Sequence, residues 1–374
     1  MDREFRKNGV SYVTVPPRLT RYLRSMLARE KGAFRWILSC LCGLLEKLAL
    51  VCALGRWPLM SPGYARRLEA EAERICREGS VDCLIPVYTQ LEALAAAKSL
   101  KNRHPELRYV PWFLDSLSGG YGLRVFTPEQ NRNRGLAWER KLLDTADAVL
   151  VMESSRRHHE TYSAGESYYG RLRYFDLPLL RRRVPGPETP LMGSGCRKLV
   201  YVGTLPRGIR SPEYLLAVLR HLDAGYHLWF IGDRDCAVLN AAARTEPRIH
   251  VMGPVDHHTA LGYEAQADIL VNLGSRNPSM TPSKIFEYMS FGKPILSLSA
   301  SPADPCREYL CRYPLALNLE EGEDPALSAA RLTEFAEKTA GACVAEALIR
   351  SRFSRNTPED LCAFLEKLGQ EVAL

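Results

Sequence analysis

Short runs of mostly apolar residues alternate along the chain with segments in which apolar residues recur every three or four positions. The short runs are typical of buried strands, and the three- to four-residue spacing is typical of helices. Their regular alternation predicts an α/β protein built on parallel sheets. The predicted strands are residues 10–15, 82–86, 108–114 and 148–152 in the first half, and 199–202, 227–231, 249–252, 268–272 and 294–298 in the second.

The predicted helices are marked by their period and by their end residues. Ser211 followed by Pro212 opens one of them, because Ser caps free amides and Pro fits the first helical position. A helix over residues 282–291 is expected to end on Gly292 in the left-handed conformation. The other helices are predicted at residues 91–101 and 135–144, from about 256, and from 357 onward.

Residues 177–196 are rich in Pro and Gly and contain three consecutive arginines, Arg181 to Arg183. Such a stretch is typical of a linker between domains. The length of 374 residues fits two domains at roughly 150 residues each. We expect an N-terminal domain over residues 1–187, a C-terminal domain over 188–354 and a final helix over 355–374.

The net charge of +7 is unevenly distributed. Residues 1–187 hold 31 Lys and Arg against 20 Asp and Glu, a net charge of +11, and the remainder carries −4. No nucleic-acid-binding motif accompanies the basic half, so we expect no nucleic-acid partner. An anionic membrane surface or a phosphate-bearing substrate fits this half better.

The most apolar stretch, residues 33–59, is interrupted by Arg35, Glu46, Lys47 and Arg56. Its longest apolar run is about ten residues, whereas a membrane-spanning helix needs roughly 20. Two interpretations stay open: a helix buried or docked on the protein, and an interfacial helix lying on a bilayer. In the second, the flanking basic residues would be Arg18, Arg21, Arg24, Arg29 and Lys31.

The eleven cysteines are scattered and form no Cys-x-x-Cys pair, which indicates reduced thiols rather than disulfides or a zinc site. The chain opens with charged residues rather than an apolar signal sequence. We therefore expect a cytoplasmic protein, with peripheral attachment at the inner membrane face left open by the basic half.

The segment around Lys284 carries the clearest candidate chemistry. Thr281 can cap a helix with Pro282 at its first position, so that the amides of Ser283 and Lys284 point outward and form an anion site. A cation is unfavourable at the start of a helix, so Lys284 indicates an anionic ligand. Glu287, one turn later on the same face, can accept hydrogen bonds from sugar hydroxyls. The alternative is a well-capped helix with a solvated Lys and Glu.

The loop over residues 203–210 follows a predicted strand and holds Arg207 and Arg210. Arginine binds phosphate through two parallel hydrogen bonds. Taken alone, this loop could be an ordinary exposed turn. Because it shares a sheet edge with the Lys284 segment, a diphosphate could lie between the two.

These segments resemble, in order and spacing, the nucleotide-sugar domain of retaining GT-B glycosyltransferases of family four, the glycosyl transferases group 1. The resemblance covers residues 199–295 and is most specific from Pro282-Ser283-Lys284 to Gly292-Lys293-Pro294. Fainter similarity to the acceptor-side domain runs through residues 82–101, 110–116 and 146–149. The final helix resembles the one that crosses back to the first domain.

The resemblance implies two Rossmann-like domains that face each other across a donor cleft. It implies hexosyl transfer from a nucleoside diphosphate sugar, with retention, to a glycan or lipid-linked acceptor in polysaccharide biosynthesis. Neither a cofactor nor a metal is expected, because Arg and Lys charges and helix amides would neutralise the diphosphate.

Within this resemblance, Glu287 would bind the ribose, and Ser283 and Lys284 would bind the diphosphate together with Arg207 or Arg210. Gly253, Pro254 and Val255 would lie against the base. The candidate catalytic residues are Asp115, Lys284 and Glu287. The implied donor-binding residues are Gly203, Thr204, Arg207, Arg210, Asp233, Gly253, Pro254, Val255, Thr281, Pro282, Ser283, Lys284 and Glu287.

The sequence departs from the family pattern in three places. Ser279 stands where the family has an acidic residue that contacts the donor sugar, which indicates a different sugar specificity. The first strand and its Gly-rich loop, about 20 residues, are missing from the expected pattern. No histidine in the first half can be assigned to catalysis, and Asp115, at the end of a strand, is the best polar candidate.

Other signals carry less weight. Asp233-Arg234-Asp235 has the form of a metal-binding DxD, but two carboxylates alone make a poor metal site. His158-His159 and His257-His258 lack the spacing of a zinc helix and are interpreted as surface or cap residues. Two alternative functions remain: a nucleotide-sugar epimerase, which would need cleft carboxylates and a His, and an inactive sugar-nucleotide-binding protein, for which the missing strand argues.

Overall fold

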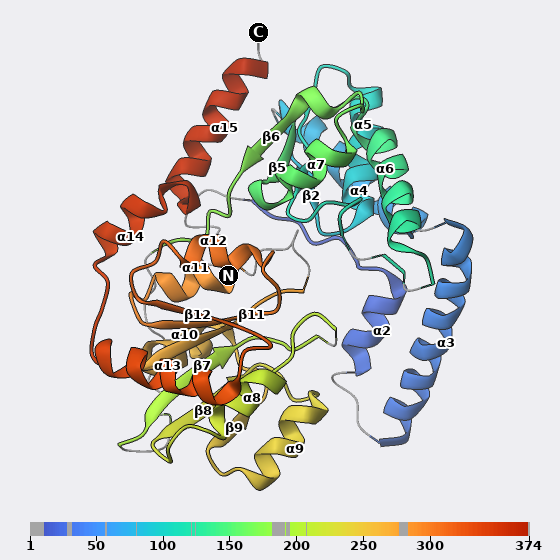
Figure 1. Cartoon of the computed structure of the whole chain (residues 1–374). Coiled ribbons are helices and arrows are strands. Elements are labelled where there is room, and N and C mark those ends of the chain that lie inside the picture. Colours follow the sequence, from blue (N-terminus) through green and yellow to red (C-terminus); the bar gives the residue numbers. More distant parts are fainter. Residues whose placement is uncertain are drawn as a thin grey trace. The chain divides into compact units, whose positions relative to one another are not determined.

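The computed structural model describes residues 11–27, 32–56, 58–79, 81–120, 122–123, 125–181, 191, 195–206, 208–276 and 283–372. The chain divides into two compact units, Met1–Tyr174 and Phe175–Leu374, which we call unit 1 and unit 2 (Figure 1). All eleven cysteines are free thiols.

The main sheet of unit 1 has four strands in the order β2-β4-β5-β6, and β1 pairs separately with β3. The breaks between β1 and β2 and between β3 and β4 fall at Pro86 and Pro111, which have no amide hydrogen. The predicted strands at 82–86 and 108–114 are therefore present, but in shorter pieces. The strands are β1 (Cys83–Leu84), β2 (Val87–Tyr88), β3 (Arg108–Tyr109), β4 (Trp112–Phe113), β5 (Val149–Met152) and β6 (Leu172–Phe175).

The prediction of a strand at residues 10–15 is wrong. Residues 11–18 form no regular structure and are mostly exposed, while residue 10 lies outside the described part of the chain. Pro16 and Pro17 follow immediately and cannot donate to a strand ladder. Their carbonyl groups accept hydrogen bonds from Arg67 instead, which ties this segment to α4.

The helices of unit 1 include two that pack on the sheet, α5 and α6. Helix α6 begins earlier than predicted because Thr127 and Gln130 form a reciprocal capping box ahead of it. Leu94 of α5 and Leu142 of α6 are buried with Val149 in one apolar core. The helices are α2 (Leu19–Leu27), α3 (Gly32–Arg56), α4 (Pro62–Glu78), α5 (Leu91–Arg103), α6 (Pro128–Leu143) and α7 (Arg156–Tyr162), with 3-10 turns at Glu153–Ser155 and Tyr169–Arg171.

Unit 2 contains a six-stranded parallel sheet in the order β12-β11-β10-β7-β8-β9. This is the doubly wound order of nucleotide-binding sheets. All five strands predicted for this half are confirmed, and β12 was missed because polar residues interrupt it. The strands are β7 (Arg197–Val202), β8 (Tyr226–Ile231), β9 (Ile249–Met252), β10 (Ile269–Leu273), β11 (Ile295–Ser299) and β12 (Ala316–Glu320).

Helices cover both faces of this sheet, and alternate strand residues supply two separate cores. Val200 and Leu270 are buried on the face that carries α10, α11 and α12, whereas Leu199 and Ile269 face α8, α9 and α13 (Figure 1). The helices are α8 (Glu213–Leu219), α9 (Ala237–Thr245), α10 (His257–Gln266), α11 (Lys284–Met289), α12 (Pro305–Leu310), α13 (Pro325–Lys338), α14 (Glu346–Arg352) and α15 (Pro358–Val372), with a 3-10 turn at Ser354–Asn356.

Gly292 follows α11 in the left-handed conformation, at φ +70°, as predicted. A Cβ atom at this position would lie 2.6 Å from the carbonyl oxygen of Val344 and 2.7 Å from Sγ of Cys343. Two independent constraints, backbone angle and space, therefore require glycine. Gly341 has almost the same angle, φ +69°, but a Cβ atom at that residue would meet nothing within 4 Å.

Substituting these two glycines separates the two constraints. Gly341→Ala should cost about 1 kcal/mol of unfolding free energy, the strain of a left-handed Ala. Gly292→Ala should cost at least about 2 kcal/mol more, because the Val344 carbonyl must also move. Urea denaturation of both variants measures the difference, and equal losses would contradict the close approach.

Candidate functional site

The candidate site of unit 2 lies where the strand order of the sheet reverses. Strands β7 and β10 are neighbours although β8 and β9 lie between them in the sequence, and ligands of such sheets bind beyond the carboxyl ends at this point. The loop after β7 contains Gly203, Thr204 and Arg210, and the chain after β10 leads to α11. The fold therefore brings the two predicted anion-binding segments to the same edge of the sheet.

Three of the predicted donor-binding residues, Arg207, Thr281 and Pro282, lie outside the described residues. Ser283 is described and directly precedes α11, which has only six residues. A helix this short has few aligned peptide dipoles. The positive charge of this segment therefore comes mainly from the Lys284 ammonium group.

Lys284 is held between two carboxylates. Its Nζ forms an ion pair with Oε1 of Glu287 and lies 3.2 Å from Oε1 of Glu264 on α10. Both carboxylates are buried, Glu264 completely and Glu287 to 5% exposure, whereas a third of the Lys284 side chain is exposed. Nε2 of His257 lies 3.6 Å from the other oxygen of Glu287. We call Lys284, Glu264 and Glu287 the Lys284 cluster.

Glu264 is the residue of this cluster that sequence reasoning missed. Burial raises its pKa to about 8; the attraction of Lys284 opposes this shift, and the negative charge of Glu287 adds to it. Within the described part of the chain, its Oε2 atom is buried without a hydrogen-bond partner. The available signal was a Glu on the buried side of α10, near Leu261 and Tyr263.

Backbone hydrogen bonds donated by glycine amides join the ends of β7, β8 and β9. The amide of Gly203 donates to Ile231 (2.8 Å), and the amide of Gly232 donates to Gly253 (3.1 Å). A Cβ atom on Gly253 would lie 1.7 Å from Nε of Arg234, so the Arg234 side chain lies directly across this backbone. Arg234 therefore covers Gly253, one of the three residues predicted to lie against the base.

Pro254 and Val255 follow this glycine and are exposed, so they are accessible to a ligand. Sequence reasoning considered Arg234 only as the middle residue of a DxD.

Asp233 uses both of its carboxylate oxygens to hold loops. Its Oδ2 accepts from the amide of Leu205 (2.6 Å), and its Oδ1 accepts from the amides of Asp235 (2.8 Å) and Cys236 (3.0 Å). These bonds tie the loop after β7 to the turn after β8. Among the residues that the structure describes, no group of three or more His, Cys, Asp or Glu side chains is placed to hold a metal ion.

Arg210 is half-buried beside Tyr201 and Asp304. Burial raises the pKa of Tyr201 to about 12 and also raises the pKa of Asp304, and the Arg210 charge opposes both shifts. Arg276, which sequence reasoning missed, joins this edge: its amide donates to Ile209 (3.3 Å) and its side chain lies 3.6 Å from Glu321. Arg210 and Arg276, from the loops after β7 and β10, and Lys284, the first residue of α11, are thus three cations at this edge.

In unit 1, Asp115 follows β4 at the carboxyl edge of the sheet and is half-buried, which raises its pKa. Tyr88, at the end of the neighbouring strand β2, has its pKa raised to about 12 by burial and by the charges of Asp115 and Glu139. Asp115 therefore lies among other polar groups at this edge.

The interpretation of His158 and His159 as surface or cap residues is wrong. Nε2 of His158 lies 2.8 Å from Oγ of Ser118, which donates to the buried carboxylate of Glu139 (3.0 Å). His159 is only 3% exposed and contacts Ser163. His158 is half-buried and links α7 to the loop that follows β4, whereas His159 is buried beside the end of its own helix. His257 and His258 are exposed, as predicted.

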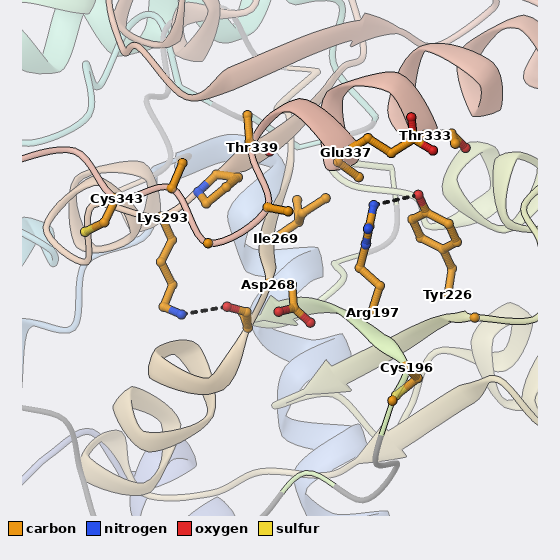
Figure 2. A pocket seen from close by; sticks show the side chains of 18 of the residues that line it. Cys196, Arg197, Tyr226, Asp268, Ile269, Lys293, Thr333, Glu337, Thr339 and Cys343 are labelled. Carbon is orange, nitrogen blue, oxygen red and sulfur yellow. Dashed lines mark hydrogen bonds between the residues drawn. The ribbon is translucent and has the colours of Figure 1, made fainter.

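A separate cavity of about 600 Å³ lies at the opposite edge of the unit 2 sheet, beside the amino ends of β7, β8 and β10 (Figure 2). None of the predicted donor-binding residues lines it. Its polar side chains bond to the protein: Lys293 donates to the carbonyl of Ala267 (2.7 Å), and Arg197 donates to the hydroxyl of Tyr226 (3.0 Å). Its position at the amino ends of the strands separates it from the candidate donor site.

Solved structures share this fold over most of both chains. Sucrose-phosphate synthase from Thermosynechococcus elongatus is 15% identical, with a TM-score of 0.59 and coverage of 83% of this chain and 78% of that one. A glycosyltransferase from Rickettsia africae is 12% identical, with a TM-score of 0.59 and coverage of 84% and 82%. Anabaena HepE in complex with UDP-glucose is 15% identical, with a TM-score of 0.55 and coverage of 80% and 82%.

These similarities confirm the predicted fold class, with two Rossmann-like domains of the GT-B type. Residues 196–330, a little over a third of the chain, match the family model described as glycosyl transferases group 1. The matched segment contains the whole candidate site of unit 2. No curated protein matches the chain.

The buried carboxyl of Glu264 predicts a pH-dependent stability. Its folded pKa lies above the ordinary value of 4.5, so the folded state binds the extra proton and its stability falls as pH rises from 5 to 8. Glu264→Gln removes this pH dependence. The stability of the variant relative to the wild type should therefore rise from pH 5 to 8. Thermal unfolding of both proteins at several pH values measures the difference, and parallel curves would contradict the raised pKa.

Proposed function

We propose that this protein is a glycosyltransferase that moves a sugar from a nucleoside diphosphate donor to a hydroxyl group of a glycan or lipid-linked acceptor in polysaccharide biosynthesis. The observation that carries the proposal is the position of Lys284. It supplies a partly exposed cation at the reversal point of a doubly wound sheet, inside the segment that matches the group 1 family model. Arg210 and Arg276 add positive charge from the neighbouring loops.

The proposed reaction retains the anomeric configuration and needs no metal. The bond between the anomeric carbon and the phosphate oxygen breaks, and the acceptor oxygen bonds to that carbon from the same face. The acceptor proton passes to the leaving phosphate. Lys284 and the arginines stabilise the negative charge that develops on the leaving diphosphate, because they are already in place before the reaction.

The base and the ribose would bind on either side of these cations. Glu287 supports ribose binding because its carboxylate is held near the ligand edge by Lys284 and His257. Gly253 and the Arg234 guanidinium would form one wall of the base site. We propose a UDP-hexose as the first donor to test, because the HepE structure of similar fold holds UDP-glucose.

Lys284→Ala and Glu287→Ala should each remove roughly 2–4 kcal/mol of transition-state stabilisation, since each deletes a preorganised contact to the donor. Turnover and hydrolysis of UDP- and GDP-hexoses, together with calorimetric binding, measure the loss. Lys338→Ala is the matched control, because Lys338 pairs with Glu334 on the exposed surface of α13.

Unchanged binding and turnover in both site variants would remove the donor-site assignment. Donor binding without any sugar transfer would favour an inactive binding protein, and interconversion of the free donor sugar would favour an epimerase.

We further propose that helices α2 and α3 of unit 1 attach the protein to an anionic membrane. None of the helices that the structure describes is long and apolar enough to cross a bilayer. Helix α3 nevertheless exposes a row of apolar side chains at three- and four-residue spacing, so that they share one side of the helix. The row consists of Phe34, Ile37, Leu41, Leu44, Leu48 and Val51.

This surface fits an interfacial helix better than a buried one. Within the side chains that the structure describes on α3, only Leu38 and Cys42 are buried, whereas Trp36 is 70% exposed. The segment 11–56 holds eight Lys and Arg residues against two Glu, which complements anionic lipid headgroups.

Membrane binding predicts that the protein floats with vesicles containing phosphatidylglycerol and much less with phosphatidylcholine alone, and that salt weakens binding. The double variant Ile37→Glu/Leu44→Glu should lose about tenfold or more in affinity, because two apolar side chains no longer enter the bilayer. Leu327→Glu, an exposed apolar site on unit 2, is the control. Self-association without vesicle binding would contradict a lipid partner.

A further inference from the structure

The negative charge of the Lys284 cluster opposes the binding of an anionic ligand. With all three groups ionised, its two carboxylates outnumber the single ammonium group and leave a net charge of −1. Charges in such a partly dry environment interact strongly. A diphosphate that approaches Lys284 would therefore meet two carboxylates already competing for the same ammonium group, unless one of them is neutral.

The two carboxyls differ in ways that identify the one to be neutralised. Glu264 is completely buried, and within the described residues its Oε2 atom has no hydrogen-bond partner. Glu287 has the nearby imidazole of His257, whose side chain is 58% exposed, on its second oxygen. The cost of keeping a charge is therefore greatest at Glu264.

We propose that Glu264 is a positioning residue that takes up one proton from solvent when the nucleoside diphosphate binds. The Lys284 ammonium group is then free to pair with the diphosphate instead of with Glu264. This inference rests on the proposed donor site. The proton goes to the unpartnered Oε2 atom, and no bond to the ligand forms at Glu264. The cluster then changes from a net charge of −1 to neutral, while Glu287 stays ionised for the ribose.

Few of the other described titratable groups around Glu264 could bind this proton in its place. Helix α10 contributes His257, which lies beside Glu287, and Asp256, whose pKa is lowered by its hydrogen bonds to Thr259. Helix α11 contributes Lys284, Glu287 and Tyr288. Burial raises the pKa of Tyr288 far above the usual range, and that of Tyr201 on β7 to about 12, so both stay neutral below pH 10.

Calorimetric titration with UDP and GDP, in two buffers of different ionisation enthalpy, counts the protons taken up. A window from pH 7.5 to 9.5 lies above the titration of a terminal phosphate, at about pH 6. We expect uptake to approach one proton per bound nucleotide above pH 8. The dissociation constant should then rise about tenfold per pH unit, the slope for one linked proton.

Glu264→Gln should abolish this uptake and give a dissociation constant that is constant across the window and close to the wild-type value at pH 7.5. Glu334→Gln, on the exposed face of α13, should keep the wild-type proton count. Proton uptake that persists in Glu264→Gln would assign the proton to another group and overturn the inference.

The wild-type measurement also separates the two proposals. If nucleotide binds without proton uptake, the inference fails and the donor site stands. If no nucleoside diphosphate binds at any pH, the proposed function fails, and the inference fails with it.

Discussion

The organisation of the candidate donor site depends on one ammonium group, that of Lys284, which forms ion pairs with two buried carboxylates. Glu264 and Glu287 belong to helices α10 and α11, which pack on the same face of the unit 2 sheet. An unpaired carboxylate in such an environment is costly, and Lys284 lies within ion-pair distance of both. The same contact ties two helices together and leaves the cation partly exposed at the ligand edge.

Glycine-containing turns and two further cations make up the rest of this edge. Glycines end β7, β8 and β9, and Asp233 uses its carboxylate to hold the loops rather than to face a ligand. Arg210 and Arg276 come from loops that are joined by a backbone hydrogen bond. This edge therefore carries three cations, Lys284, Arg210 and Arg276, although the second half of the chain carries a net negative charge.

Unit 1 presents a different kind of surface. Its basic charge and the apolar row on α3 occur in the same segment, which is the combination that an anionic bilayer attracts. At its sheet edge, Asp115 and Glu139 both lie near Tyr88, and His158 contacts Ser118, which is hydrogen-bonded to Glu139. The polar groups of unit 1 thus gather at the carboxyl ends of its strands, as those of unit 2 do.

The sequence by itself determined the α/β class, the strands of unit 2, the left-handed Gly292 and the placement of Lys284 and Glu287 on one helix. These follow from local apolar patterns and from residues whose backbone or charge preferences act over a few positions. Tertiary structure alone decided that Glu264 pairs with Lys284, that Arg234 covers Gly253 and that His158 faces inward, while the strand predicted at 10–15 did not form. Such contacts join residues that are distant in the sequence. Their energies depend on burial, which cannot be inferred from the neighbouring residues alone.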